Sequence, residues 1–252
     1  MRRPELLLLA LLAAFAAFVG AQVVRAPARA AVASAREDEP AGEETGAGPS
    51  PARPAHDPAA VRRRLVERGF GTYVGDILAL EDSALQRWPD ERRTDPVRVW
   101  VQPRSAVDGW TPHCPQLARD GFLAWEQAGL PLRFAFVDDS ASAEVRVAWV
   151  DHIDPAPRIG VTRRMSDPEG WIVGGTIDIA THGVGGRVLE EDVIRTTALH
   201  EVGHLIGLDH TSDPTSVMSA EAQAARHLLS SSDKATVALL YEVTPGTIAA
   251  GR

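Results

Sequence analysis

The stretch HEVGHLIGLDHTSDPTSVM, residues 200–218, decides the fold of this chain and the chemistry that it can support. His200 and His204 are four residues apart, so on an α-helix they share one face, about one turn apart. Two neutral imidazoles at that spacing can bind one zinc ion, and Glu201 between them can act on a metal-bound water. His210 follows His204 by six residues. Three nitrogen ligands leave a fourth coordination position open, which is typical of a catalytic zinc rather than a structural one.

A glycine and a methionine strengthen this interpretation. A helix continued past His204 would carry His210 away from the metal, whereas Gly207 can adopt φ > 0, end the helix and return the chain. Met218 follows His210 by eight residues, in the sequence Ser-Val-Met-Ser. Solvated or core imidazoles are the alternative interpretation of the histidines, and that alternative leaves their joint spacing unexplained.

The pattern HExxHxxGxxH followed by a methionine turn resembles the metzincin signature. Within that clan, the sequence is most similar to the matrixins, the matrix-metalloproteinase-like family. The later segment LSSSDKATVALLY, residues 229–241, resembles the closing helix of that family. Ala220 stands two residues after Met218, where the astacin and serralysin branches have a tyrosine. Over residues 97–180, the order of the predicted strands and helices is compatible with that of the matrixins.

The resemblance implies an α+β, metzincin-like catalytic domain over residues 69–245. Its parts are a mixed twisted sheet with an edge strand at the cleft, a zinc-binding helix and a C-terminal helix. It also implies one catalytic Zn²⁺, with Glu201 as the general base and Met218 as an apolar floor under the ligands. The edge strand is expected to bind substrate backbone as an added strand, through Ile159, Gly160, Val161 and Thr162. Residues 219–228 are expected to wall the pocket for the residue after the cleaved bond.

The predicted function is therefore a zinc-dependent endopeptidase that hydrolyses peptide bonds in proteins outside the cytoplasm. The alternative is a catalytically silent relative that keeps the fold as a binding module, which the intact ligands and Glu201 disfavour. A membrane-tethered structural protein is a further alternative, and it leaves the zinc motif without a role.

The sequence also departs from the family pattern. No PRCGxPD cysteine switch is present, and the single cysteine, Cys114, lies in TPHCPQ inside the expected domain. A small, partly buried residue at the start of a helix is the simpler interpretation of Cys114. His152 and His182 stand singly, so we expect loop residues rather than ligands of a second zinc. Isolated acids could bind calcium, although no clear calcium motif contains them: Asp151, Asp154, Asp167 and Asp178.

Hydrophobic spacing predicts the remaining elements. Strands are expected at residues 97–101, 133–137, 144–150, 159–163 and 171–180, the last interrupted by Gly174-Gly175. Helices are expected at residues 59–68 and 116–128, from residue 190 through the metal motif, and at residues 230–241 with Ser231 or Ser232 as the N-cap. An apolar stripe is expected on the motif helix at Ile194, Ala198, Val202 and Leu205. Short strands or turns are expected at residues 73–80 and 84–88.

The N-terminal region predicts export. Two arginines precede an apolar run, so residues 1–24 are either a cleaved signal peptide or a membrane anchor, with membrane contact through residues 6–24. Residues 25–68 are rich in Ala, Pro, Gly and acids, which indicates a disordered linker or a short pro-segment. Residues 246–252 are expected to form a frayed tail.

Composition limits the partners. The 252 residues carry a formal net charge of −8, which argues against nucleic acid, because a phosphate backbone calls for a basic surface. One cysteine permits no intrachain disulfide. We expect a monomer that acts on protein or peptide substrates.

Overall fold

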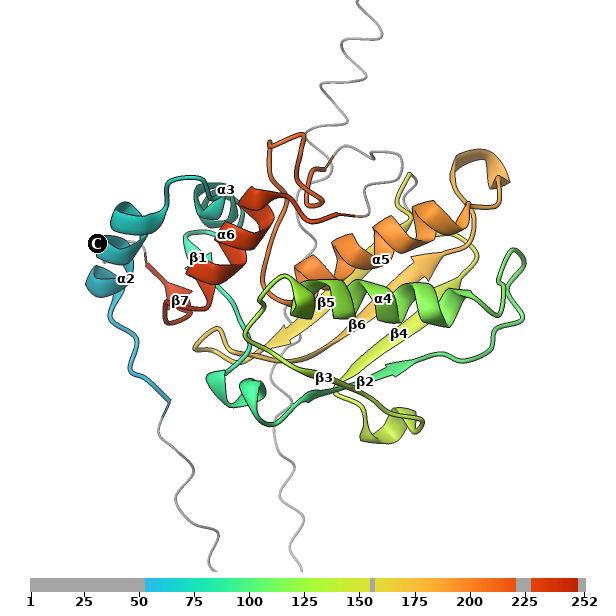
Figure 1. Ribbon diagram of the computed structural model, residues 1–252, viewed down its shortest axis with the longest axis horizontal. Helices are drawn as coiled ribbons and strands as arrows, with labels where there is room; N and C mark the ends of the chain where they lie inside the picture. The colour runs from blue at the N-terminus through green and yellow to red at the C-terminus, as the bar shows by residue number, and fades with distance from the viewer. Residues whose placement is uncertain (1–52, 155–156, 221–227, 249–252) are drawn as a thin grey trace, which may run out of the picture.

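The computed structural model describes residues 53–154, 157–220 and 228–248, and a five-stranded mixed sheet lies at its centre (Figure 1). The strand order is β3-β2-β4-β6-β5. The strands are β2 (Val97–Val101), β3 (Phe134–Phe136), β4 (Val145–Val150), β5 (Gly160–Ser166) and β6 (Ile172–Ala180). Strand β5 runs antiparallel to β6 at one edge, and the other neighbours are parallel. The predicted mixed sheet and its edge strand are confirmed, with β5 three residues longer at its C-terminal end than expected.

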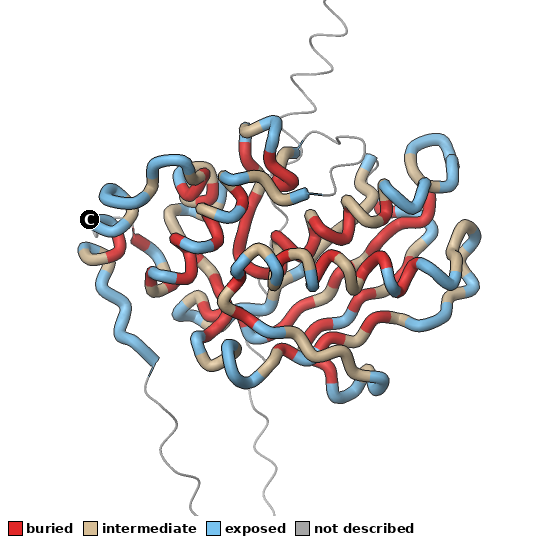
Figure 2. The backbone as a smooth tube through the Cα atoms, viewed as in Figure 1, coloured by how far each residue is buried: buried red, intermediate tan, exposed pale blue. Residues whose placement is uncertain are grey.

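Two helices cover one face of this sheet: α4 (Cys114–Gln127) and α5 (Glu191–Leu205) (Figure 1). They approach closely at Gly121, where a Cβ would lie 3.0 Å from the carbonyl carbon of Ala198. The stripe predicted on α5 is confirmed, because each of its four members is at most 2% exposed. Strand β4 alternates as expected, with Val145, Val147 and Trp149 buried. Apolar side chains of the sheet and the two helices therefore form one core. In Figure 2 the buried residues of these elements are red.

Trp125 shows how this core sets the position of α5. The side chain is fully buried, and burial of a ring of this size contributes about 2–3 kcal/mol. Its Nε1–H donates to the carbonyl oxygen of Leu199 at 2.9 Å, so the ring has a polar partner as well as an apolar environment. Helix α4 thus fixes α5 one residue before the metal motif begins.

A smaller group of elements lies at the end of the sheet where α5 ends (Figure 1). It contains α2 (Pro58–Arg68), α3 (Val74–Leu80) and α6 (Ser231–Leu240), with β1 (Ala84–Leu85) antiparallel to β7 (Gly246–Thr247). Short 3₁₀ turns lie at Asp90–Arg93, Ser140–Ser142 and Val184–Gly186. The strand or turn expected at residues 73–80 is wrong. Val74 and Ile77 are three residues apart and both are buried, which is the spacing of a helix face.

The folded part of the chain extends beyond the expected limits of 69 and 245. Helix α2 is confirmed, and its Val61 is only 4% exposed in the main core, although it lies within the region expected to be a linker. At the other end, residues 246–248 are paired rather than frayed: Ile248 N–H donates to the Ser83 carbonyl at 2.8 Å. The average composition of the terminal segments did not indicate that single apolar residues, such as Val61 and Ile248, are buried there. The predicted signal peptide or anchor at residues 1–24 lies outside the described residues.

Two local expectations fail for identifiable reasons. Strand β6 runs without a break through Gly174 and Gly175. A Cβ on Gly175 would lie 2.9 Å from both the Arg163 carbonyl and Leu205 Cδ1, so the glycine permits close packing rather than an interruption. The N-cap of α6 is Ser230, because its hydroxyl accepts from Asp233 N–H while the Asp233 carboxylate accepts from Ser230 N–H. This reciprocal capping box places the start one residue before the predicted serines.

Within the described residues, no helix is long and apolar enough to cross a membrane.

Candidate metal centre

Three histidines meet at the C-terminal half of α5. His200 and His204 lie on one face of the helix, with their Nε2 atoms 3.1 Å apart. His210 comes from the turn after the helix, and the ligand atoms of all three lie within 4.8 Å of one another. All three side chains are partly exposed, so the cluster opens on one side. In the described part of the chain, this is the group of metal-ligating side chains that comes together.

The turn that returns His210 depends on Gly207. Its φ of +106° lies in the region that favours glycine. Gly207 N–H donates to the His204 carbonyl and Leu208 N–H donates to the Gly203 carbonyl, both at 3.0 Å. This pair of bonds is a Schellman motif, which ends the helix and reverses the chain. A Cβ at Gly207 would lie 2.1 Å from the carbonyl oxygen of Gln86, so no side chain fits there.

Backbone carbonyls orient two of the imidazoles. His200 Nδ1 lies 2.7 Å from the Val217 carbonyl, and His204 Nδ1 lies 3.1 Å from the Leu208 carbonyl. A carbonyl only accepts, so each Nδ1 carries the proton and each Nε2 presents its lone pair to the other ring. Two lone pairs facing each other at 3.1 Å repel unless a cation lies between them. This donor set fits zinc, which prefers neutral imidazole nitrogen.

Burial lowers the pKa of two of the three imidazoles, those of His204 and His210. It lowers the pKa of His204 well below the ordinary value, and the charge of His200 lowers it further. Burial, followed by the charge of His200, lowers the pKa of His210 to about 4. Protons therefore compete poorly with a metal for these two nitrogens at neutral pH.

Glu201 points from α5 toward the edge strand. Its side chain is 4% exposed, and Thr162 Oγ1 lies 2.7 Å from its Oε2 and 2.9 Å from its backbone carbonyl oxygen. A Cβ on Gly160 would lie 2.4 Å from Glu201 Oε1, so the glycine leaves room for the carboxylate. Burial raises the pKa of Glu201, and the charge of His200 and the Thr162 hydrogen bond oppose that shift. A carboxyl group with a raised pKa is suited to accept a proton.

The expected substrate-binding residues fall into two sets on β5. Ala180 N–H donates to the Ile159 carbonyl at 2.9 Å, so the backbone groups of Ile159 and Val161 face β6. The backbone groups of Gly160 and Thr162 therefore face the free edge of the sheet. The side chain of Thr162 faces α5, because it is hydrogen-bonded to Glu201. A Cβ on Gly160 would point the same way, toward Glu201 Oε1.

Met218 lies beneath the zinc helix. It is fully buried, and a Cβ on Gly203 would lie 2.3 Å from its sulfur, so the thioether packs directly on α5. The preceding residue, Val217, is held by the buried carboxylate of Asp233, which accepts its N–H at 3.2 Å. Tyr73 Oη donates to the same carboxylate at 3.1 Å. The buried carboxylate therefore orders the carbonyl that orients His200.

Side chains that the sequence did not single out satisfy the carbonyls at the end of α5. Arg164 Nη1 donates to the His204 carbonyl at 3.1 Å, and Trp88 Nε1 donates to that of Leu205 at 3.0 Å. Tyr241 Oη donates to that of Ile206 at 2.9 Å. The carbonyls at the end of a helix lack partners from a following turn of that helix, and here the His204 carbonyl also accepts from Gly207 N–H at 3.0 Å. The available signal for Arg164 was its spacing from Gly160 and Thr162, since residues two apart on a strand share a face.

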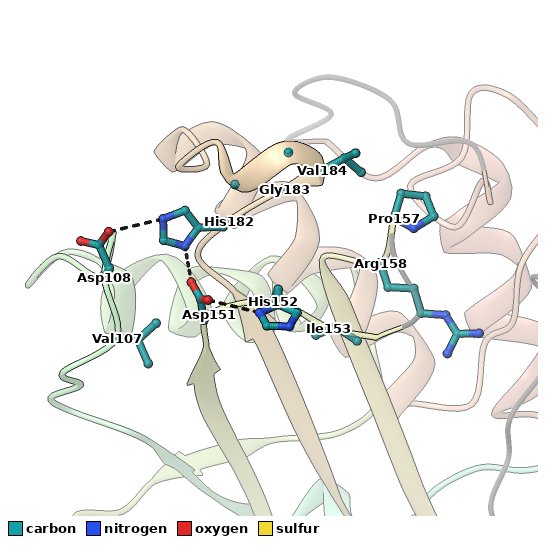
Figure 3. A pocket seen from close by; sticks show the side chains of 12 residues that line it. Val107, Asp108, Asp151, His152, Ile153, Pro157, Arg158, His182, Gly183 and Val184 are labelled. Atoms are coloured by element: carbon teal, nitrogen blue, oxygen red, sulfur yellow. Dashed lines mark hydrogen bonds and ion pairs between the residues drawn. The ribbon is translucent and has the colours of Figure 1, made fainter.

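The other histidines and acids considered in the sequence form no second cluster of this kind within the described residues, in line with the expectation that His152 and His182 are not ligands of a second zinc. His182 lies between two aspartates beside a cavity of about 640 Å³, with its Nδ1 2.7 Å from Asp151 Oδ1 and its Nε2 3.7 Å from Asp108 Oδ2 (Figure 3). His152 is exposed and contacts Asp151 and Asp154. Asp167 pairs with Arg53 and Asp178 pairs with Arg163, so ion pairs already engage those acids. Cys114 is buried at the start of α4. Most of the expected pocket wall, residues 221–227, lies outside the described residues.

Comparison with known proteins identifies relatives of this site. The Matrixin family model matches residues 110–242, which is more than half of the chain. The chain is 32% identical over 93 residues to "Probable matrix metalloproteinase 095L" of Invertebrate iridescent virus 3, covering 37% of this chain and 23% of the relative. It is 28% identical over 144 residues to "Metalloendoproteinase 1-MMP" of Arabidopsis thaliana, covering 50% of this chain and 37% of the relative.

The chain therefore spans 23% and 37% of the length of these two relatives. The family match includes the three histidines, Glu201 and the methionine turn, together with most of the sheet and both helices that cover it. The protein belongs to the matrixin family, as the resemblance in its sequence predicted.

Proposed function

We propose that this protein is a zinc endopeptidase that cleaves proteins outside the cytoplasm. The observation that carries the proposal is the joint geometry of one site. Three imidazoles turn their ligand atoms toward one point, within 4.8 Å of one another, and a buried carboxyl group lies next to them in the same helix. Membership of the matrixin family supports the reaction class, since its members are metallopeptidases.

His200, His204 and His210 would hold the metal, and Met218 would form the apolar floor beneath them. When bound, zinc supplies a Lewis acid that lowers the pKa of water and polarises a carbonyl group. Glu201 accepts the proton of the attacking water and passes it to the leaving amine. Thr162 holds the carboxylate in place through its 2.7 Å hydrogen bond, and Gly160 leaves space for it. These two contacts limit the positions that the carboxylate of the proposed base can take.

The edge strand supplies a backbone template for the substrate. The outward-facing N–H and C=O groups of Gly160 and Thr162 can pair with an extended peptide, which joins the sheet as an added strand. The same two residues face Glu201 with their side-chain positions. A peptide bound to this edge lies beside the proposed base and the ligands.

Export rests on the N-terminal sequence. Residues 1–24 are proposed to carry the chain out of the cytoplasm, as a cleaved signal or as an anchor. Sequencing the N-terminus of the mature protein distinguishes the two, because a cleaved signal leaves no residue before about position 21.

The experiment is removal and return of the metal during cleavage of a peptide library by the full chain. A chelator should abolish cleavage, and one equivalent of zinc should restore it, because the ligand set is proposed to hold the metal. His200→Ala should be inactive at that zinc concentration. The matched control is His152→Ala, since His152 is exposed and outside the three-histidine group. The proposal would be contradicted if cleavage continued at the same rate in the presence of the chelator, or if the zinc-loaded native protein cleaved no peptide.

A further inference from the structure

We propose that Arg164 and helix α3 position the turn that carries two of the zinc ligands. The inference rests on the proposed function and adds residues that act on the ligands through the backbone. Arg164 lies on β5, Asp76 lies in the first turn of α3, and Glu81 is the C-cap residue that follows that helix. All of α3 lies before residue 110, where the family match begins.

Arg164 holds the segment between the ligands. Its side chain is only 6% exposed, and its Nη1 donates to the His204 carbonyl at 3.1 Å and the Leu208 carbonyl at 3.3 Å. The Leu208 carbonyl is also the partner of His204 Nδ1. The guanidinium group therefore fixes the acceptor that sets the orientation of the His204 ring. Partners of this kind tune metal affinity without touching the metal.

Glu81 fixes the guanidinium group in turn. Its Oε1 lies 2.6 Å from Arg164 Nη2, and both side chains are nearly buried. Asp209 completes the cluster: its Oδ2 lies 3.9 Å from Arg164 Nη2, and its Oδ1 accepts the N–H of His210 at 2.7 Å. One guanidinium group thus joins α3, the edge strand and the backbone on both sides of Gly207.

Asp76 holds the chain beyond the third ligand. One carboxylate oxygen accepts from Thr211 Oγ1 at 2.7 Å and from Ser212 N–H at 3.2 Å. His210 therefore lies between two attachments to α3, one through Glu81, Arg164 and Asp209, and the other through Asp76. The segment after α3 reaches the same turn, since the Gln86 carbonyl occupies the space beside Gly207.

A positioning role and a purely structural role for these residues predict different measurements. A residue that only stabilises the fold changes the unfolding temperature, whereas a positioning residue changes the affinity for zinc in protein that remains folded. The second effect is measurable without any substrate.

The experiment compares zinc binding by full-length variants, using competition with a chromophoric chelator, and the visible spectrum of the Co²⁺-substituted proteins. Glu81→Ala should raise the Kd for zinc by about tenfold, within the range for loss of an outer partner of a ligand. Glu81→Gln keeps an oxygen acceptor for Arg164 and should recover most of that affinity. Asp76→Ala should weaken zinc binding by about threefold to tenfold. The matched control is Arg68→Ala, which removes an exposed ion pair between α2 and Glu242 far from the ligands.

Circular dichroism of the metal-free variants ensures that folded proteins are compared. If Glu81→Ala does not fold, Asp76→Ala provides the test, because one of its two hydrogen bonds, from Ser212 N–H, is exposed. Unchanged Kd and Co²⁺ spectra in the folded variants would overturn the inference while leaving the proposed function intact. If the native protein binds zinc but cleaves no peptide, the proposed function fails, and weaker binding by the variants would still support the positioning role.

Discussion

The zinc motif is one continuous stretch of sequence, whereas the regions that support it lie in separate parts of the chain. Residues 200–218 carry every proposed ligand, the proposed base and the methionine turn in one continuous stretch. The supporting contacts come from β5 and from the segment that runs from α3 to Trp88, which lie far away in the chain. The motif supplies the kinds of atoms that the chemistry needs. The supporting regions determine where those atoms point.

This difference has a physical cause. A metal requires particular donor types at particular spacings, so the motif residues are recognisable without a structure. A carbonyl at a helix end requires only some donor, and here Arg164, Trp88 and Tyr241 donate from three separate parts of the chain. A site can therefore keep its motif while its support differs between relatives.

The largest effect should come from Gly207, where the two regions touch. Gly207→Ala places a Cβ 2.1 Å from the Gln86 carbonyl at a φ of +106°, so the turn must shift. We expect a loss of about 2–3 kcal/mol of stability, or about 5–10 °C in Tm, with weaker zinc binding. Thermal unfolding with and without zinc measures both effects.

Gly75→Ala is the matched control for Gly207→Ala. Gly75 lies in α3, its φ is ordinary, and a Cβ added there would meet no atom of another segment within 4 Å. The substitution should leave zinc binding unchanged and raise stability by up to about 1 kcal/mol through helix propensity. Equal stability and zinc affinity in the native protein and Gly207→Ala would show that the turn does not depend on this glycine.

A smaller and more selective effect is expected at the edge strand. Gly160→Ala brings a Cβ to 2.4 Å from Glu201 Oε1, so the carboxylate must move while the ligands keep their places. We expect kcat to fall by about tenfold to a hundredfold with zinc content retained, because catalysis is sensitive to displacement of the base by about 1 Å. Steady-state kinetics with metal analysis, again beside Gly75→Ala, checks this. A native kcat would show that the space at Gly160 has no part in positioning Glu201.

Much of the fold was predictable because alternation and spacing are local. The strand at Val145–Val150 and the helices α4 and α5 follow from apolar periodicity, and the strand at Val97–Val101 follows from its β-branched content. The edge position of β5 follows from its short length and polar flanks. Helix α3 was not predicted, because Val74, Ile77 and Leu78 in a short segment fit a strand or a turn as readily as one face of a two-turn helix. Contacts with distant elements stabilise its helical form. One of them is the hydrogen bond from the N–H of Tyr73, the N-cap residue, to Thr236 Oγ1 in α6.

The candidate site divides in the same way. The three histidines, Glu201 and Gly207 were identified from spacing, and the structure brings the histidines together. The sequence assigned Thr162 to the substrate as part of the edge strand, which stays a prediction, and the structure adds a hydrogen bond from its side chain to Glu201. Arg164 and Glu81 were missed because their partners are backbone carbonyls and each other, across 83 residues of sequence. No local pattern records such a contact.

Glu201→Ala in the full chain tests the proposed mechanism most directly, with zinc content and peptide cleavage measured on the same samples. Glu201 lies among the ligands in sequence, and its carboxylate accepts a hydrogen bond from Thr162 on the edge strand at 2.7 Å. We expect one zinc per chain, as in the native protein, and cleavage reduced by at least about a hundredfold, the scale of general-base catalysis. Cleavage close to the native rate in zinc-loaded Glu201→Ala would contradict the role of Glu201 as the base.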